Sequence, residues 1–152
     1  MFQKAQAEDC RAVYKLICDM EQKELPYDRF HNIFLGQLAR PDFYCLLLKE
    51  EGQVLGMLNL RFEEQLHHAA RIAEIMELAV APSCRNNGLG KALFLHACTL
   101  AKEAGCIQME VACNQLRKDT HRFYLREGMR NFHYKFSKSL TGEDMTENRL
   151  GR

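Results

Sequence analysis

The sequence predicts an α/β fold, in the form of an α+β arrangement with a mixed β-sheet and helices on both faces. Short apolar runs of strand-like composition alternate with longer segments of helical spacing. Two strand-like runs flank Glu50-Glu51-Gly52, which is typical of a tight hairpin turn. A third run stops at Pro82 and leads, through a polar turn with two glycines, into a long amphipathic helix. The expected order of elements is β, α, α, β, β, β, α, β, α, β.

The N-terminal half is expected to form a short strand, two helices and a hairpin. Residues 8–24 carry apolar side chains at helical spacing, which leaves one face for burial. Pro26 ends this helix, and Asp28 is a suitable cap for a second helix that continues to about Ala39. Strands are expected at 2–6, 43–49 and 53–62, followed at 63–69 by a polar segment that suggests a loop or a strand end.

The C-terminal half alternates strands with helices. A strand is expected at 70–81, and the helix that follows at 88–104 ends at Gly105. Gly128 ends a later helix in the same way. The remaining elements are expected as strands at 106–113 and 132–137 and a helix at 117–127. We therefore expect one domain over residues 1–140 and a polar, mobile tail at 141–152.

Composition and charge exclude several classes of function. The chain has 152 residues, of which 47% are apolar and 27% charged, and a formal net charge of +1. This balance does not suggest a nucleic-acid-binding arm, and no apolar stretch approaches the roughly 20 residues that a membrane span needs. The seven cysteines are odd in number and form no Cys-x-x-Cys pair, which favours buried thiols in a reducing, cytoplasmic compartment. The alternative is a nucleophilic thiol at Cys84, beside the glycine turn.

The turn between Pro82 and the long helix carries the main functional signal. Backbone amides at the start of a helix have no intrahelical partner, and they lie at the positive end of the helix dipole. Because Gly88 and Gly90 have no side chains, an anionic group can approach these amides closely. The pattern indicates a pyrophosphate cradle. Two common cradles do not fit, because the ATP-binding P-loop needs Ser or Thr where Ala92 stands and the dinucleotide fingerprint needs glycine where Leu93 stands.

The remaining pattern, Arg85-x-x-Gly88-x-Gly90 after a Leu-Ala-Val strand, resembles the acetyl-CoA signature of the GNAT family of N-acetyltransferases. This resemblance implies a splayed central β-sheet flanked by helices on both faces. It places acetyl-CoA between the strand before the glycine turn and the strand after the long helix. The implied reaction is direct attack of a deprotonated amine on the thioester of acetyl-CoA.

The resemblance also implies roles for individual residues. The backbones of Leu78 and Val80 would pair with the pantetheine arm and the acetyl group, and Asn114 matches a polar contact to pantetheine. Tyr124 matches a tyrosine that protonates the departing thiolate, although its spacing alone would also fit a core aromatic residue. Seven consecutive residues would wrap the pyrophosphate: Arg85, Asn86, Asn87, Gly88, Leu89, Gly90 and Lys91.

Acetylation of an amine also needs a base, because an ammonium ion cannot attack a carbonyl carbon. Glu74 and Glu77 are the carboxylates on the strand before the glycine turn. Their odd spacing predicts opposite faces of a regular strand, so only one is expected to face the acetyl group. Glu74 stands where several family members carry a catalytic glutamate, which makes it the first candidate and Glu77 the second. An ordered water or a structural ion pair is the alternative.

Further segments look like the aminoalkylphosphonate N-acetyltransferases: Val13–Cys18, Leu66-His67-His68, Glu74–Leu78 and His121–Gly128. One difference is Met129, which stands directly after Gly128, where these enzymes commonly have an aromatic residue. That subfamily acetylates small aminoalkylphosphonates and is described as using a divalent metal. His67, His68 and Glu74 are therefore candidates for binding the acceptor's anionic group or a metal ion. The alternative for two adjacent histidines in a polar segment is a solvated surface position.

The expected partners are acetyl-CoA and a small primary amine, with neither nucleic acid nor membrane, and a homodimer is left open. Two other functions stay open at this point. One is a protein or peptide N-acetyltransferase on the same fold, and the other is a noncatalytic domain that binds acyl-CoA. Retention of both Glu74 and Tyr124 argues against the noncatalytic domain.

Overall fold

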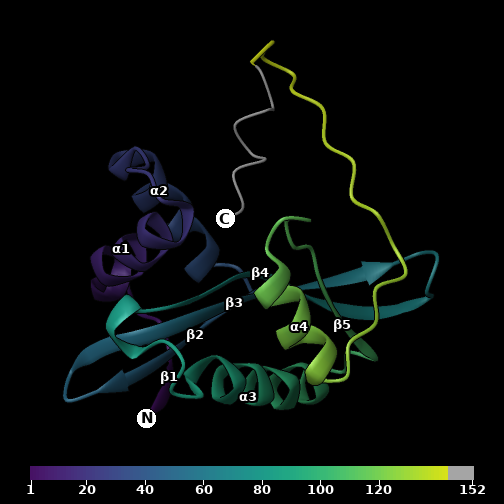
Figure 1. The fold of residues 1–152 in the computed structure, drawn as a ribbon, viewed down its shortest axis with the longest axis horizontal. Coiled ribbons are helices and arrows are strands. Elements are labelled where there is room, and N and C mark those ends of the chain that lie inside the picture. The colour runs from purple at the N-terminus through teal and green to yellow at the C-terminus, as the bar shows by residue number, and fades with distance from the viewer. Residues whose placement is uncertain (144–152) are drawn as a thin grey trace. The chain divides into compact units, whose positions relative to one another are not determined.

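The computed structural model describes residues 1–143, and Figure 1 shows its helices and strands. The chain divides into two compact units, Met1–Val111 and Ala112–Arg152. The predicted single domain over 1–140 stays a prediction. Of the predicted mobile tail at 141–152, residues 144–152 lie outside the described part of the chain.

The first unit is built on a five-stranded sheet in the order β1-β2-β3-β4-β5. Neighbouring strands are antiparallel from β1 to β4, and β4 and β5 are parallel, so the predicted mixed sheet is confirmed. The long β3 and β4 form a hairpin whose turn occupies residues 66–69. The strands are β1 Phe2–Lys4, β2 Phe43–Glu50, β3 Gln53–Gln65, β4 Ala70–Val80 and β5 Gln108–Val111.

Helices cover both faces of this sheet. On one face lie α1 (Cys10–Glu21) and α2 (Tyr27–Leu38), preceded by the short 3₁₀ turn η1 (Ala7–Asp9). Their apolar sides pack on the sheet with Val13, Leu16 and Phe34 buried among them. The helix α3 (Leu89–Glu103) covers the other face (Figure 1) and buries Leu93, Phe94 and Ala97. The expected cap at Asp28 is wrong, because α2 already begins after Pro26 and Asp28 lies inside its first turn.

Gly56 on β3 allows the sheet and α3 to approach closely. A Cβ atom at this position would lie 2.8 Å from Cδ1 of Leu93, which is fully buried. Packed side chains do not approach this closely, so a larger residue would force Leu93 and α3 to shift. The glycine therefore sets the spacing between the sheet and the helix that starts at the glycine turn.

Within residues 112–143, the described part of the second unit, the chain forms the helix α4 (Lys118–Arg126), and Tyr124 is its buried residue. The strand predicted at 132–137 is not formed, and this segment has no regular secondary structure. Its apolar alternation is real, but Phe132, Tyr134 and Phe136 are all at least 74% exposed. Alternation predicts a strand only where a neighbouring strand supplies backbone partners, and the described residues supply none here. In residues 1–143 no helix is long and apolar enough to cross a membrane.

Candidate functional site

The glycine turn has the geometry expected of an anion cradle. After the 3₁₀ turn η2 (Pro82–Cys84), Gly88 adopts φ +78° as the residue that begins α3. No side chain caps this helix end, and the first amide bonded within the helix is that of Ala92, which donates to the Gly88 carbonyl oxygen at 3.0 Å. A Cβ atom built at Gly88 or Gly90 would meet nothing within 4 Å. The amides of the first helical turn are thus accessible to a phosphate group.

The sheet opens next to this cradle. The parallel pairing of β4 with β5 runs from Ile72–Gln108 to Ile75–Val111 and stops there. Residues 76–80 of β4 therefore have a strand partner on the β3 side only, as far as residues 1–143 are concerned. Unpaired backbone groups on a strand edge can bind an extended ligand by hydrogen bonds. This agrees with the splayed sheet that the family resemblance implied.

A β-bulge at Met76 changes the faces of the two glutamates. Glu74 pairs with Arg61, and Glu77 pairs with Asn59, while Met76 is the extra residue that the register shift leaves unpaired. Since Asn59 and Arg61 are two residues apart on β3, they share a face, and the glutamates opposite them share it too. The expectation that Glu74 and Glu77 point to opposite faces is therefore wrong. The bulge adds one residue to the strand and reverses the side-chain alternation.

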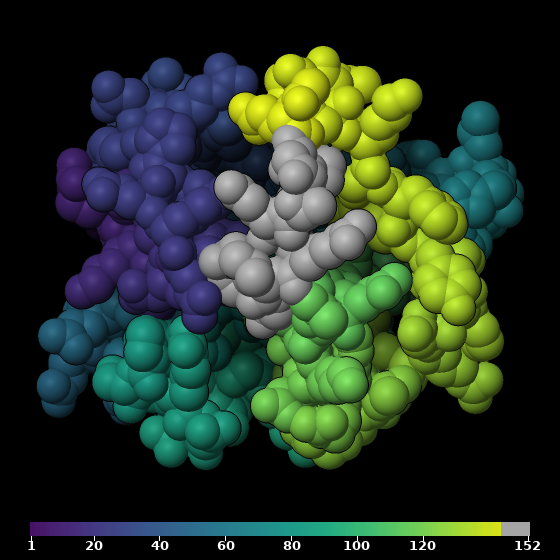
Figure 2. Space-filling view, turned by 45° about the horizontal axis from the view of Figure 1, so that its top comes forward, coloured from purple at the N-terminus to yellow at the C-terminus, as the bar shows by residue number. Residues whose placement is uncertain are grey.

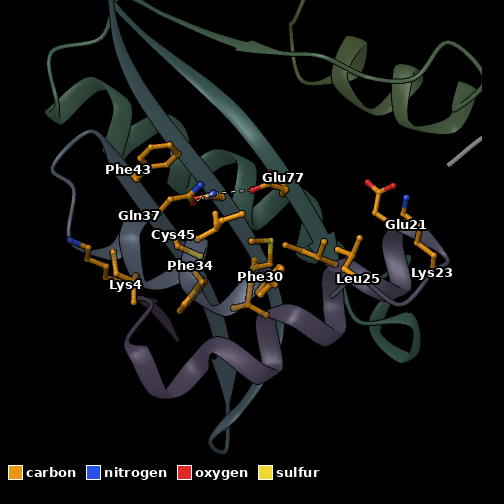
Figure 3. Close-up of a pocket in the computed structure, with 16 residues that line it drawn as sticks. Lys4, Glu21, Lys23, Leu25, Phe30, Phe34, Gln37, Phe43, Cys45 and Glu77 are labelled. Carbon is orange, nitrogen blue, oxygen red and sulfur yellow. Dashed lines mark hydrogen bonds between the residues drawn. The ribbon is translucent and has the colours of Figure 1, made fainter. Parts of the chain in front are cut away.

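A cavity of about 340 Å³ lies on this same face, between the sheet and helices α1 and α2 (Figure 3). Ligand sites for small molecules typically start near this volume. Glu77 lines the cavity and Glu74 does not. Most of the wall is apolar, with Val13, Ile17, Phe30, Phe34, Phe43 and Met57 among its residues.

Glu77 is held in a small polar network on the cavity wall. Asn59 Nδ2 donates to Glu77 Oε1 at 2.9 Å and to Gln37 Oε1 at 3.0 Å. Burial raises the pKa of the Glu77 carboxyl, and the nearby charges of Glu21 and Glu74 raise it too, against the lowering effect of the Asn59 hydrogen bond. A carboxylate with a raised pKa is a better proton acceptor, which suits a general base.

Glu74 has a different environment. Its Oε1 lies 3.4 Å from Nη2 of Arg61, with which it forms an ion pair. Arg61 also lies 3.6 Å from a carboxylate oxygen of Glu63. The structural ion pair that the sequence left open as an alternative is thus present at Glu74.

His67 and His68 lie in the turn of the β3–β4 hairpin. This turn projects from the molecule on the side away from α1 and α2 in both Figures 1 and 2. Glu77 is seven residue steps along β4 from Ala70, at the start of the strand, which corresponds to roughly 23 Å. The rings of the two histidines pack on each other at 4.4 Å, and His68 Nδ1 lies 2.6 Å from Gln65 Oε1. Neither histidine lines the cavity.

The candidate metal ligands do not gather into a metal centre. Among residues 1–143 no group of three or more His, Cys, Asp or Glu side chains is placed to hold an ion. Of the three candidates, Glu74 is paired with Arg61 and the two histidines lie at the hairpin turn. The residues therefore do not fit the divalent ion that the resemblance implied, and we derive no step through a metal.

Tyr124 and Asn114 belong to the second unit. Burial raises the pKa of the Tyr124 hydroxyl to about 12, with a further contribution from Cys113. The Asn114 side-chain oxygen accepts a hydrogen bond from the Leu116 amide at 2.8 Å, and its carbonyl oxygen lies 2.7 Å from His121 Nε2. These contacts fix the turn that precedes α4. Cys84, the alternative nucleophile, is a free thiol.

Sequence reasoning missed Asn59, Gln37 and the two lysines of the cavity, Lys4 and Lys23. One signal was present for Asn59, because a polar residue in the apolar run Leu58-Asn59-Leu60 of a central strand needs a reason to be there. Gln37 carried no such signal, since it lies on a helix of mixed composition.

The chain is similar to known proteins over most of its length. The acetyltransferase (GNAT) family model matches residues 7–129. An aminoalkylphosphonate N-acetyltransferase of Salmonella typhimurium is 40% identical over 136 residues, which are 90% of this chain and 88% of that protein. Among solved structures, a protein from Bacillus halodurans described as a transcriptional regulator has a TM-score of 0.85 at 20% identity, covering 92% of this chain and 99% of that one. Glucosamine-6-phosphate N-acetyltransferase from Arabidopsis thaliana has a TM-score of 0.76 at 20% identity, covering 92% of this chain and 97% of that one. At these identities the two structures show a shared fold and no more.

Proposed function

The chain belongs to the acetyltransferase (GNAT) family, and on that premise we propose that it transfers the acetyl group of acetyl-CoA to the primary amine of a small aminoalkylphosphonate. The observation that carries the proposal is the bulge at Met76, which directly follows the last residue of β4 paired with β5 and places Glu77 on the face of the cavity that it lines. One residue is thereby placed beside both the open strand edge and a small-molecule cavity. Release of free CoA thiol from acetyl-CoA in the presence of 2-aminoethylphosphonate tests the proposal.

Glu77 is the proposed base, in place of the Glu74 that the sequence ranked first. The acceptor enters the cavity as an ammonium ion, and the Glu77 carboxylate accepts one of its protons. The free amine then attacks the carbonyl carbon of the thioester, and the carbon–sulfur bond breaks. The raised pKa of Glu77 supports this role, because it brings the pKa of the base closer to that of the amine.

Tyr124 is the proposed donor to the leaving thiolate, a role that rests on the family resemblance. With a pKa of about 12 the hydroxyl keeps its proton at every working pH. Complete proton transfer to a thiolate of ordinary pKa, roughly 8.5, would be uphill by about 5 kcal/mol. The Tyr124 hydroxyl is therefore proposed to keep its proton and to stabilise the developing thiolate by donating a hydrogen bond to it.

The charges of the cavity support an acceptor that carries both an amine and an anionic group. Lys4 and Lys23 line it at opposite ends (Figure 3), and Glu77 lies between them. Both lysine side chains are exposed, so water screens their charge, and each offers a modest attraction to a phosphonate oxygen. The volume of about 340 Å³ favours a small molecule over the extended peptide that a protein acetyltransferase would take.

Three further expectations stay part of this proposal. A divalent metal remains a prediction of the resemblance, although the described residues form no ligand group for it. A homodimer also stays a prediction. The cytoplasmic location is supported by free thiols such as Cys84, Cys10 and Cys45, which a reducing compartment preserves.

Substitution of Gly88 by glutamate is expected to weaken acetyl-CoA binding at least tenfold, because it places a negative charge among the amides that receive the pyrophosphate. Gly88→Gln is the matched control, since it has the same size and the same backbone cost at φ +78°. Calorimetric titration with acetyl-CoA measures both variants. Glutamate should weaken binding clearly more than glutamine, and unchanged affinity in folded Gly88→Glu would contradict the cradle.

Replacing His67 or His68 by alanine is expected to leave the KM for the phosphonate within about twofold of the parent value. Both rings lie at the hairpin turn and outside the cavity. Steady-state kinetics measures the KM for the phosphonate in each variant. Repeating the measurement with a chelator separates an effect of the histidines from a requirement for a metal ion. A large rise in acceptor KM, with the KM for acetyl-CoA unchanged, would move the acceptor site to the hairpin.

A further inference from the structure

Asn59 lies on the cavity wall, and one atom of its side chain, the oxygen Oδ1, is buried without a hydrogen-bond partner in the described part of the chain. Asn59 is only 5% exposed and lines the cavity wall. Both of its amide N–H groups are used, one by Glu77 and one by Gln37. Its Oδ1 atom is buried and has no hydrogen-bond partner within the described residues.

Glu77 determines which way this amide points. An ionised carboxylate can only accept hydrogen bonds, so Asn59 must turn its NH₂ group toward Glu77. The second N–H then meets Gln37 Oε1, which is also an acceptor. The opposite orientation would bring Oδ1 against two acceptors. The carboxamide oxygen is therefore held in one direction by two neighbours.

A buried acceptor without a donor is costly, and few occur in native proteins. The cost disappears when a ligand brings an N–H or O–H group to the oxygen. A primary ammonium group has three N–H donors, so it can donate to Glu77 and to Asn59 Oδ1 at the same time. A hydroxyl group has one donor and cannot satisfy both.

We propose that Asn59 Oδ1, together with the Glu77 carboxylate, binds the acceptor's ammonium group and selects amines against other small phosphonates. This inference rests on the proposed function and adds a specificity-determining residue to it. Asn59 also acts as a positioning residue, because its NH₂ group holds the carboxylate of Glu77 beside the bound nitrogen. Gln37, which also lines the cavity, holds the amide in place through its side-chain oxygen.

The test is a comparison of two ligands on three proteins. Binding of 2-aminoethylphosphonate and 2-hydroxyethylphosphonate is measured by calorimetry on the parent protein, on Asn59→Leu and on Gln37→Met. Leucine branches at Cγ as asparagine does and has no polar atom, although it is larger. Gln37→Met removes the other partner of the amide while keeping Oδ1. We expect the parent to prefer the amine, and Asn59→Leu to lose roughly tenfold of that preference. Gln37→Met should keep most of it.

Two controls separate this effect from others. Loss of the Asn59 NH₂ group also raises the pKa of Glu77, so binding is measured from about pH 6 to about pH 9. An effect through Glu77 alone fades once its carboxyl is ionised, whereas the loss of the oxygen persists. Circular dichroism and the melting temperature establish that each variant is folded.

An amine preference within twofold of the parent value in folded Asn59→Leu, at high pH, would overturn the inference. So would an equal loss in Gln37→Met. A parent protein that binds the amine selectively but releases no CoA would refute the proposed reaction and leave the assignment of Asn59 standing. Turnover by the parent protein, together with an unchanged amine preference in Asn59→Leu, would support the proposed reaction and refute the assignment of Asn59.

Discussion

Substitution of Glu77 by glutamine is expected to lower kcat for amine acetylation by roughly 10²- to 10⁴-fold, the usual contribution of a general base. Glutamine has the same shape, and its side-chain oxygen can still accept the hydrogen bond from Asn59 Nδ2. It cannot take a proton from the ammonium group. The KM for acetyl-CoA should barely change, because the cradle lies at the start of α3.

Glu74→Gln is the matched control for this experiment. Glu74 shares the face of Glu77, but it is paired with Arg61 and does not line the cavity. We expect a loss of less than about tenfold. The reverse ranking, a large loss in Glu74→Gln and a small one in Glu77→Gln, would return the base to the residue that the sequence ranked first.

The pH dependence of activity and stability gives an independent check. Burial raises the pKa of Glu77. As the pH is lowered, the rate of the parent protein should therefore begin to fall at a higher pH than it would with a base of ordinary glutamate pKa. That limb should be absent in Glu77→Gln. A raised folded-state pKa also means that the stabilising contribution of the protonated carboxyl is present at low pH and lost as the pH rises through the folded pKa. Glu77→Gln should therefore melt at or above the parent temperature near pH 8, and this advantage should shrink toward pH 4.

Substitution of Tyr124 by phenylalanine is the second change with a large expected effect. It removes one oxygen atom and should lower kcat by roughly 10²- to 10³-fold, the usual cost of removing one hydrogen-bond donor to a developing anion, while acetyl-CoA binding stays nearly unchanged. Single-turnover kinetics with acetyl-CoA and the phosphonate acceptor measures the chemical step. The loss of kcat should be smaller when acetyl-CoA is replaced by an acetyl thioester whose thiol has a lower pKa. Its thiolate is a more stable leaving group and gains less from the hydrogen bond.

Tyr134→Phe provides the matched control for Tyr124. Tyr134 lies in the same unit and is 80% exposed, so removal of its hydroxyl should leave turnover within about twofold of the parent value. A turnover of Tyr124→Phe within the same twofold would make Tyr124 a core aromatic residue and nothing more.

The glycine turn was predictable because its function depends on backbone. Gly88 has φ +78° and starts a helix, and a sequence shows such a position directly as glycine between a strand and an amphipathic segment. The order of the other elements and the approximate spans of the helices and of β2 to β4 were predictable from the spacing of apolar residues. The strand at 132–137 failed, since alternation says nothing about whether a partner strand is present.

The position of Glu77, the proposed base, could not be predicted in this way. The bulge at Met76 reverses the alternation of β4, and methionine there has no property that marks a bulge. Nor does the sequence show that Glu77, Asn59 and Gln37 meet, because they come from β4, β3 and α2. Their contact depends on how α2 packs across the sheet, which is a property of the folded chain.

Release of free CoA thiol, measured with a panel of acceptors of equal size, tests the central claim most directly. The panel pairs 2-aminoethylphosphonate with a neutral primary amine and with 2-hydroxyethylphosphonate, each with and without a chelator. We expect kcat/KM to be at least tenfold higher for the aminophosphonate than for the neutral amine, and no acetylation of the hydroxyl compound. Equal kcat/KM for the aminophosphonate and the neutral amine would remove the phosphonate from the proposal, and no CoA release with any amine would contradict the acetyltransferase account as a whole.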